Sequence, residues 1–233
     1  MSRSATERAD VGCRSSGVSG ERGTALLLAI TLVLLLLAIG GAVSIATRTE
    51  TLIAANFRQS RQAFYAAEGA IALSVRDLDG IADWSAALSG AAASSFTDGA
   101  AIGTRTLPGG GSVVLCCGPG SLTDDVQNRA HGGRSWGADT PQWQIFAWGP
   151  ASGWLAPGRI ESVMYVAVWI ADDAADKDGN PAADTNGLIE LHAQALGPGG
   201  GRRVVEVLVE RPAAGGGPQL PGLRIVTWGE VRW

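Results

Sequence analysis

The feature that most constrains this chain is an uncharged apolar segment near its N-terminus. Residues 24–46 (TALLLAITLVLLLLAIGGAVSIA) contain no Asp, Glu, Lys or Arg. As an α-helix, a segment of this length rises about 35 Å, which is enough to cross the hydrocarbon core of a bilayer. Soluble core helices are rarely apolar on all sides. The segment therefore predicts one helix that enters a membrane.

Three interpretations of this segment compete. A cleaved secretory signal has a shorter apolar region, about 7–15 residues long. A plain signal anchor fits the physics equally well, but only as far as Ala46. A prepilin-type leader is cut just before the apolar run, so that the helix stays on the mature protein. Arginines before the span favour a cytoplasmic N-terminus, whereas Arg48, Arg58 and Arg61 after it oppose that orientation.

The sequence after Ala46 continues a helical pattern. Apolar residues recur at steps of three, four or seven and fall on one helical face. The pair Asp79-Gly80 is a suitable terminator. We therefore predict one helix from Thr24 to about Asp79, in which residues 47–79 carry a stripe that packs on a sheet. The stripe residues are Ile53, Phe57, Phe64, Ile71, Val75 and Leu78.

The rest of the chain, residues 80–233, has a different composition. All ten prolines and all eight tryptophans lie at or after Trp84, and alternating apolar patterns between Gly/Pro turns predict strands. Around Ile189–Ala195 the alternation indicates a strand with one exposed face, on which Glu190, His192 and Gln194 lie. We predict an α+β fold: a long N-terminal helix, half transmembrane, packed on a C-terminal antiparallel sheet. The expected strands are 112–116, 142–148, 160–170, 187–195, 202–210 and 223–228.

An acidic cluster lies on the loop between two strong predicted strands, 160–170 and 187–195. Calcium takes six to eight hard oxygen ligands from closely spaced side chains and carbonyls, and residues 171–186 (ADDAADKDGNPAADTN) supply them. The spacing does not match an EF-hand, and the alternative is a solvated turn rich in turn-forming residues. The candidate calcium ligands are Asp172, Asp173, Asp176, Asp178, Asn180 and Asp184.

Other motifs argue against enzymatic and nucleic-acid functions. A net charge of −4 does not suit a nucleic-acid binder, which needs a basic face. The string Gly133–Gly137 matches a hydrolase nucleophile elbow around Ser135, with Asp172 and His192 following in order, but its flanks are loop-like. His131 and His192 are too isolated for a zinc site. We expect no catalytic site, and no cofactor except the candidate calcium ion.

The adjacent Cys116 and Cys117 fit either a disulfide in an oxidising compartment or two partly buried thiols. We favour the thiols, because cysteine is among the most often buried residues. An exposed subset of the tryptophans, such as Trp154 and Trp228, is a candidate for partner binding.

Residues 21–69 carry a family resemblance. They contain Arg-Gly before the apolar run, an Ala-Asn-Phe-Arg segment and the string Gln-Ala-Phe-Tyr-Ala-Ala-Glu. This region resembles the N-terminal region of PilX-type minor pilins, which are type IV pilus assembly proteins, and residues 226–231 give a weaker echo. The resemblance implies cleavage by a prepilin peptidase after Gly23, so that residues 1–23 are a leader and Thr24 becomes the N-terminus, where pilins are methylated.

The resemblance also implies partners and a location. Major pilins carry Glu at the fifth mature position, where this chain has Leu28; the difference resembles subunits associated with initiation and the filament tip. Expected partners are other minor and major pilins, through the helix, and the inner membrane before assembly, with the head in the periplasm. Such pili serve adhesion or motility. The alternative is a K-type pseudopilin of a type II secretion system, whose head usually carries a large inserted α-helical domain.

Overall fold

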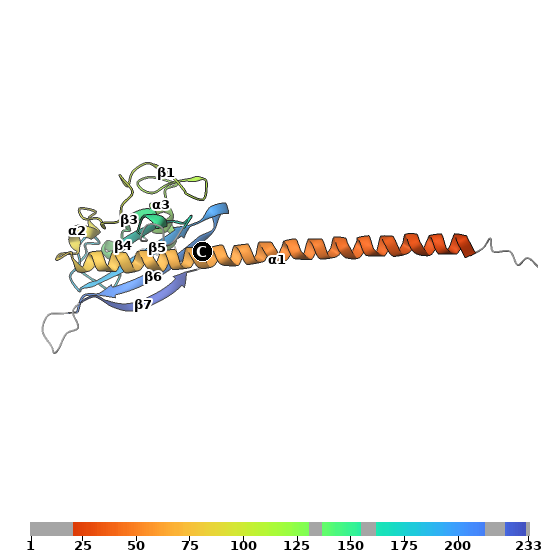
Figure 1. Ribbon diagram of the computed structural model, residues 1–233. Coiled ribbons are helices and arrows are strands. Elements are labelled where there is room, and N and C mark those ends of the chain that lie inside the picture. The colour runs from red at the N-terminus through yellow and green to blue at the C-terminus, as the bar shows by residue number, and fades with distance from the viewer. Residues whose placement is uncertain (1–20, 131–136, 155–161, 213–221, 232–233) are drawn as a thin grey trace, which may run out of the picture. The chain divides into compact units, whose positions relative to one another are not determined.

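The computed structural model describes residues 21–130, 137–154, 162–212 and 222–231. The chain divides into two compact units, residues 1–54 and residues 55–233. One long helix, α1 (Glu21–Asp79), contributes to both units and is labelled in Figure 1. The long helix and the C-terminal antiparallel sheet give the α+β arrangement that the sequence predicts.

In the first unit, the apolar part of α1 is exposed on all sides. Of the described residues, α1 forms the one helix that is long and apolar enough to cross a membrane. Hydrocarbon does not solvate hydroxyl groups, so polar side chains there need partners within the protein. The hydroxyl of Thr31 donates to the carbonyl of Leu28 at 2.9 Å, and that of Thr47 donates to the carbonyl of Val43 at 3.0 Å. These threonines are therefore satisfied by the helix itself.

The second unit is built on a five-stranded antiparallel sheet whose strands follow one another in chain order. Antiparallel neighbours can follow one another in this order because they need no crossover helix between them. The register places Trp169 opposite His192 and Ala193 opposite Val205. The strands are β3 (Gln144–Pro150), β4 (Tyr165–Asp172), β5 (Leu188–Leu196), β6 (Arg202–Glu210) and β7 (Arg224–Val231), and a separate hairpin joins β1 (Thr104–Thr106) to β2 (Ser112–Val114).

The strand positions predicted from the sequence are close to those observed. Strand β6 has the predicted bounds, and β5 is displaced by one residue. Strand β7 extends to Val231, beyond the predicted end at Trp228. The predicted strand 160–170 begins at Tyr165 in the structure, and its first two residues lie outside the described residues.

One face of the sheet packs against the second half of α1. The helix approaches closely because its contacting residues are mostly small, and a Cβ added to Gly69 would lie 3.2 Å from the ring of Trp154. The short helix α2 (Ser85–Leu88) and the preceding Trp84 extend the same core. Figure 1 shows this half of α1 running along the sheet. The fully buried α1 residues of this core are Ala63, Ala67, Ala70, Ile71 and Leu78.

The six residues of the predicted apolar stripe are distributed unequally over this arrangement. Two are buried, two are partly buried against the core and two are exposed: Ile71 and Leu78, Phe64 and Val75, and Ile53 and Phe57. The exposed pair, with 62% and 63% of their surface accessible, lies nearest the apolar segment in sequence. The hydrophobic pattern predicted that the bulky residues contact the sheet. Three of the five buried α1 residues are instead alanines, whose small size allows close packing.

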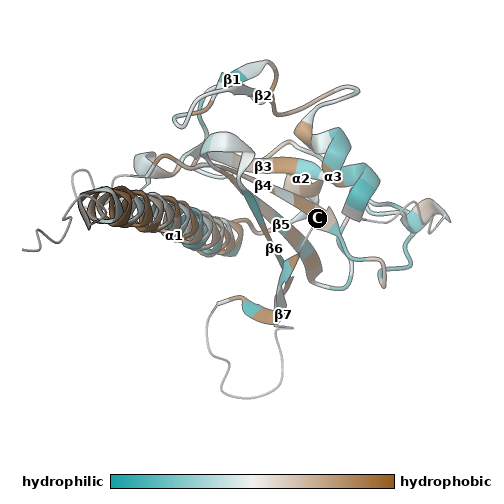
Figure 2. Ribbon diagram, turned by 90° about the vertical axis from the view of Figure 1, so that its right-hand side faces the viewer, coloured by the Kyte–Doolittle hydropathy of each residue, from teal (hydrophilic) through white to brown (hydrophobic). Residues whose placement is uncertain are grey.

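The other face of the sheet is covered as well. Helix α3 (Leu122–Ala130) and the hairpin β1–β2 contribute to a second core with the tryptophans of β3 and β4, and Figure 2 shows the sheet between α1 and α3. His192 and Gln194 are therefore fully buried. The expectation of an exposed second face on this strand was wrong, because α3, the hairpin β1–β2 and Trp143 cover it. The buried residues of this core include Leu115, Val126, Trp143, Trp148, Tyr165 and Trp169.

The C-terminal end of α1 is fixed by Asp77. Its Oδ2 accepts hydrogen bonds from the hydroxyls of Ser94 at 2.6 Å and Ser95 at 2.8 Å, and from the N–H of Ser95 at 2.7 Å. Burial acts to raise the pKa of Asp77, but these bonds outweigh it and the pKa is lowered. The N–H of Ser94 in turn donates to the carbonyl of Phe146 at 2.8 Å, so one carboxylate joins α1 to β3.

Cys116 and Cys117 form a disulfide between neighbouring residues. The structure thus differs from the pair of partly buried thiols that we favoured. Cys117 has a φ of 76°, in the left-handed region that residues other than glycine seldom adopt.

We predict that Ala67→Leu destabilises the second unit, because a larger side chain does not fit between α1 and the sheet. The free energy of unfolding should fall by about 1–3 kcal/mol, measured on the full chain in detergent micelles by urea unfolding with tryptophan fluorescence. Ala72→Leu is the matched control, because Ala72 is an exposed α1 residue. Equal stability of the two variants would contradict this packing.

Candidate functional site

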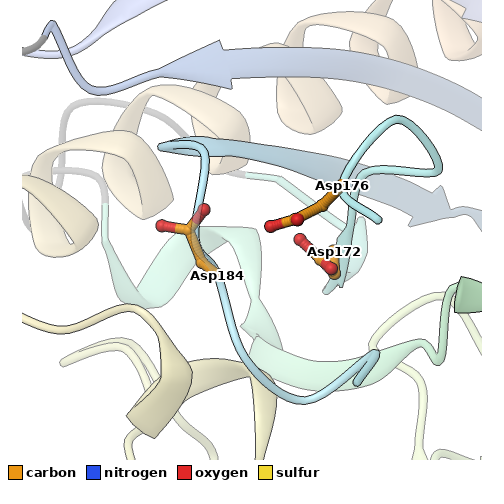
Figure 3. Close-up of side chains that lie close together, drawn as sticks. All are labelled: Asp172, Asp176 and Asp184. Atoms are coloured by element: carbon orange, nitrogen blue, oxygen red, sulfur yellow. The ribbon is translucent and has the colours of Figure 1, made fainter. Parts of the chain in front are cut away.

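Three carboxylates converge at the end of β4 and in the loop that follows it. One oxygen of each of Asp172, Asp176 and Asp184 lies within 4.8 Å of the corresponding oxygens of the other two, and Figure 3 shows the three side chains close together. Asp172 is the last residue of β4 and shares the α1-facing side with Ile170, because alternate residues of a strand lie on one face. The arrangement presents hard oxygen atoms of the kind that bind cations.

The hydrogen bonds of the three carboxylates differ. Asp176 accepts bonds from the N–H of Thr185 at 2.8 Å and from its hydroxyl at 2.7 Å. Asp184 accepts a bond from the N–H of Gly187 at 2.8 Å. Asp172 is 4% exposed, and its Oδ1 is buried without a hydrogen-bond partner. Among the described residues, no Lys or Arg forms a salt bridge with any of the three.

The other three predicted ligands accept hydrogen bonds within the turns of the loop. Asp173 accepts bonds from the amide of Asn186 at 2.6 Å and from the N–H of Ala175 at 2.9 Å. Asp178 accepts a bond from the N–H of Asn180 at 2.7 Å, and the side chain of Asn180 accepts one from Ala182. Asp178 and Asn180 are exposed. The structure therefore brings together half of the predicted set and places the rest in the loop's own turns.

Burial and mutual repulsion make this cluster electrostatically unfavourable by itself. Burial raises the pKa of Asp172 to about 7, with further contributions from the charges of Asp176 and Asp173. The pKa of Asp184 is also raised, mainly by burial. Burial acts in the same direction on Asp176, but the bonds from Thr185 outweigh it and lower the pKa of that carboxyl. The loop thus holds Asp176 ionised beside two carboxyls that burial disfavours as anions.

A second polar group lies on the opposite face of the sheet. His192 on β5 contacts Glu206 on β6 through Nδ1 at 2.8 Å and Gln194 through Nε2 at 2.8 Å. Burial lowers the pKa of His192, although Glu206 acts to raise it. The rings of Trp143 and Trp169 meet the imidazole edge-on, with centroids 5.5 and 5.9 Å away. The alternating pattern of β5 placed His192 and Gln194 on one face of the strand, but no local signal showed that this face is buried.

The hydrolase motif is not assembled by the described residues. Ser135 and His131 lie outside them. Asp172 pairs with Ile189, and His192 pairs with Trp169, so Asp172 and His192 lie on opposite faces of the sheet. They cannot belong to one catalytic triad, which requires hydrogen-bond contact between its members.

The expected processing position lies in a regular part of α1. Gly23 and Thr24 are both helical, in a helix that begins at Glu21. A Cβ added to Gly23 would meet nothing within 4 Å. A side chain at this position would therefore leave the helix undisturbed.

Apolar side chains are also exposed on β7, at the edge of the sheet. Trp228 is 48% exposed and packs edge-on against Phe64 of α1, with ring centroids 5.8 Å apart. Ile225 is exposed beside it. Trp154, which we expected to be exposed with Trp228, is partly buried against Phe96 and donates its indole N–H to the carbonyl of Pro150 at 2.9 Å. Of the two candidate partner-binding tryptophans, only Trp228 is exposed.

Comparison with known proteins returns no match: no protein-family model, no curated protein and no solved structure matches this chain.

We predict that Glu190→Gln stabilises the protein at high pH. Burial, with the charges of Glu206 and Asp173, raises the pKa of Glu190 from 4.5 to about 7. Because the folded state binds this proton more tightly than the unfolded state, the free energy of unfolding falls as the pH rises from 4.5 to about 7. Near pH 8 the variant should therefore be more stable than wild type, by up to about 3 kcal/mol.

The difference should disappear near pH 4, where the glutamate is protonated in both states. Urea unfolding of the full chain across this range checks the prediction, with Glu50→Gln on α1 as a control at an exposed position. A constant difference between Glu190→Gln and wild type at all pH values would contradict it.

Proposed function

We propose that this chain is a minor pilin-like structural subunit that takes part in initiation or tip assembly of a type IV pilus. The observation that carries the proposal is the dual character of α1. Residues 24–46 are uncharged and exposed on all sides, and the second half of α1 packs on an antiparallel sheet. A subunit of this kind works by assembly: one part of the helix binds lipid or sister helices, and the other holds the head.

The exposed apolar half of α1 requires a nonaqueous environment. Its leucines, isoleucines and valines have no partner within the described residues of the first unit. Before assembly a bilayer would cover them, and in a filament the same surface would pack against other pilin helices. The resemblance of residues 21–69 to PilX-type proteins supports the second environment as well as the first.

Leu28 supports a role in initiation. A carboxylate in hydrocarbon is expensive unless it is paired, and in major pilins the acid at this position is thought to pair with the terminal amine of a neighbouring subunit. Leu28 is an exposed apolar residue here. A first subunit has no preceding neighbour to supply the partner, so an apolar side chain is the less costly choice.

The second candidate is a K-type pseudopilin of a type II secretion system, a class that also lacks the acid at the fifth mature position. Such heads usually carry a large inserted α-helical domain. In the described part of the second unit, the α-helices after α1 are α2 and α3, of four and nine residues. This short helical content favours the pilus subunit.

We predict that a prepilin peptidase cuts the chain between Gly23 and Thr24. Coexpression with the peptidase should yield a mature protein whose N-terminal sequence begins at Thr24, and its omission should leave the leader intact. Gly23→Val should block the cut. Gly40→Val is the matched control, because an added Cβ at either glycine meets nothing within 4 Å.

A wild-type chain that keeps its leader in the presence of an active peptidase would contradict the proposed processing. So would cleavage after the apolar segment, which is the result expected for a secretory signal.

A further inference from the structure

The strongest unexplained feature of the second unit is the buried carboxylate of Asp172. A buried charged group is normally paired or coordinates a metal, because removing it from water is costly. Its Oδ1 has no hydrogen-bond partner, yet it lies beside two further carboxylates, as Figure 3 shows. This buried carboxylate, with one unpartnered oxygen, thus lies where negative charge gathers.

We propose that Asp172, Asp176 and Asp184 bind a calcium ion that fastens the β4–β5 loop to the end of the sheet. Calcium–oxygen distances of about 2.3–2.6 Å allow two ligands of one ion to be up to about 5.2 Å apart. The three carboxylate oxygens lie within 4.8 Å of one another. The spacing is therefore compatible with three ligands of one calcium ion.

The size of the cluster favours calcium over magnesium. Magnesium binds oxygen at about 2.0–2.1 Å in near-ideal octahedral geometry, so its ligands lie within about 4.2 Å of one another. Calcium tolerates irregular geometry and accepts carboxylates that bind through one or both oxygens. Three carboxylates provide up to six oxygens, and water completes the shell.

The charges around the cluster are consistent with a cation. The two cationic side chains near this loop have other partners: Lys177 donates to the carbonyl of Ala174 at 2.7 Å, and Arg211 donates to the carbonyl of Ala82 at 2.7 Å and stacks on Trp84. Arg211 acts on Asp184 only at a distance. The cluster therefore keeps excess negative charge that a divalent ion would balance.

The ion would connect three separate points of the chain. Asp172 ends β4, Asp176 lies early in the loop, and Asp184 lies close to the start of β5. The N–H of Asp184 also contacts the hydroxyl of Ser85 on α2 at 3.4 Å. Because Leu88 of α2 belongs to the core under α1, calcium would stabilise this whole end of the second unit.

The test measures calcium binding and thermal unfolding of the full chain in detergent micelles after removal of metal with a chelator. Calcium should bind in isothermal titration calorimetry. It should raise Tm by about 5–10 °C at a concentration about 100 times Kd. Magnesium at the same concentration should give a smaller rise.

Asp172→Asn separates metal binding from a structural role. The amide keeps the shape of the side chain but removes the buried charge, so the variant should weaken calcium binding roughly 10-fold or more. In chelator its Tm should equal or exceed that of wild type, because the unpaired buried carboxylate is gone. Asp178→Asn is the matched control, because this loop residue is exposed and an amide can still accept the bond from Asn180.

Three results would overturn the proposal. The first is the absence of calcium binding and of any Tm shift at millimolar calcium. The second is a larger Tm rise with magnesium than with calcium. The third is an Asp172→Asn variant that binds calcium as wild type does, or whose Tm falls equally in calcium and in chelator.

Discussion

The close contact between the alanine face of α1 and the sheet is the interaction on which the rest of the second unit depends. Ala63, Ala67 and Ala70 are small enough to bring the helix backbone near the strands, where dense packing supplies much of the stability. The bonds of Asp77 to residues 94 and 95 then hold the chain that leads into the sheet. Since residues 24–46 of the same helix are uncharged and apolar, α1 continues from the sheet contact into the candidate membrane span.

The helix and strands could be predicted from local sequence patterns, but which of their faces are buried could not. Helical and strand periodicities depend on neighbouring residues, so α1 and the bounds of β6 were predictable. Burial of the second sheet face depends on α3 and the hairpin β1–β2 packing over it, and His192 contacts Glu206, which is fourteen residues away. The exposure of Phe57 was missed for a related reason: helical periodicity does not show where along α1 the contact with the sheet begins.

In the acidic loop, too, the sequence predicted the kind of site but not which residues form it. Its composition identified a candidate cation site, because Asp and Asn supply hard oxygens. The same residue types also form turns, and only the three-dimensional path separates the two uses. Asp178 and Asn180 accept bonds from the loop backbone, whereas Asp172 points into a cluster with an unsatisfied oxygen. Sequence spacing alone could not have selected Asp172, Asp176 and Asp184 from the six.

The proposed role, a subunit that starts or ends a filament, rests on the exposed apolar part of α1, on Leu28 and on the compact head. The most direct measurement is the position and copy number of the protein in purified pili, by immunogold labelling and quantitative mass spectrometry. An initiating or tip subunit should appear in very few copies at one end, and its deletion should reduce the number of filaments. An even distribution along the filament at high copy, or normal pili in its absence, would contradict this role.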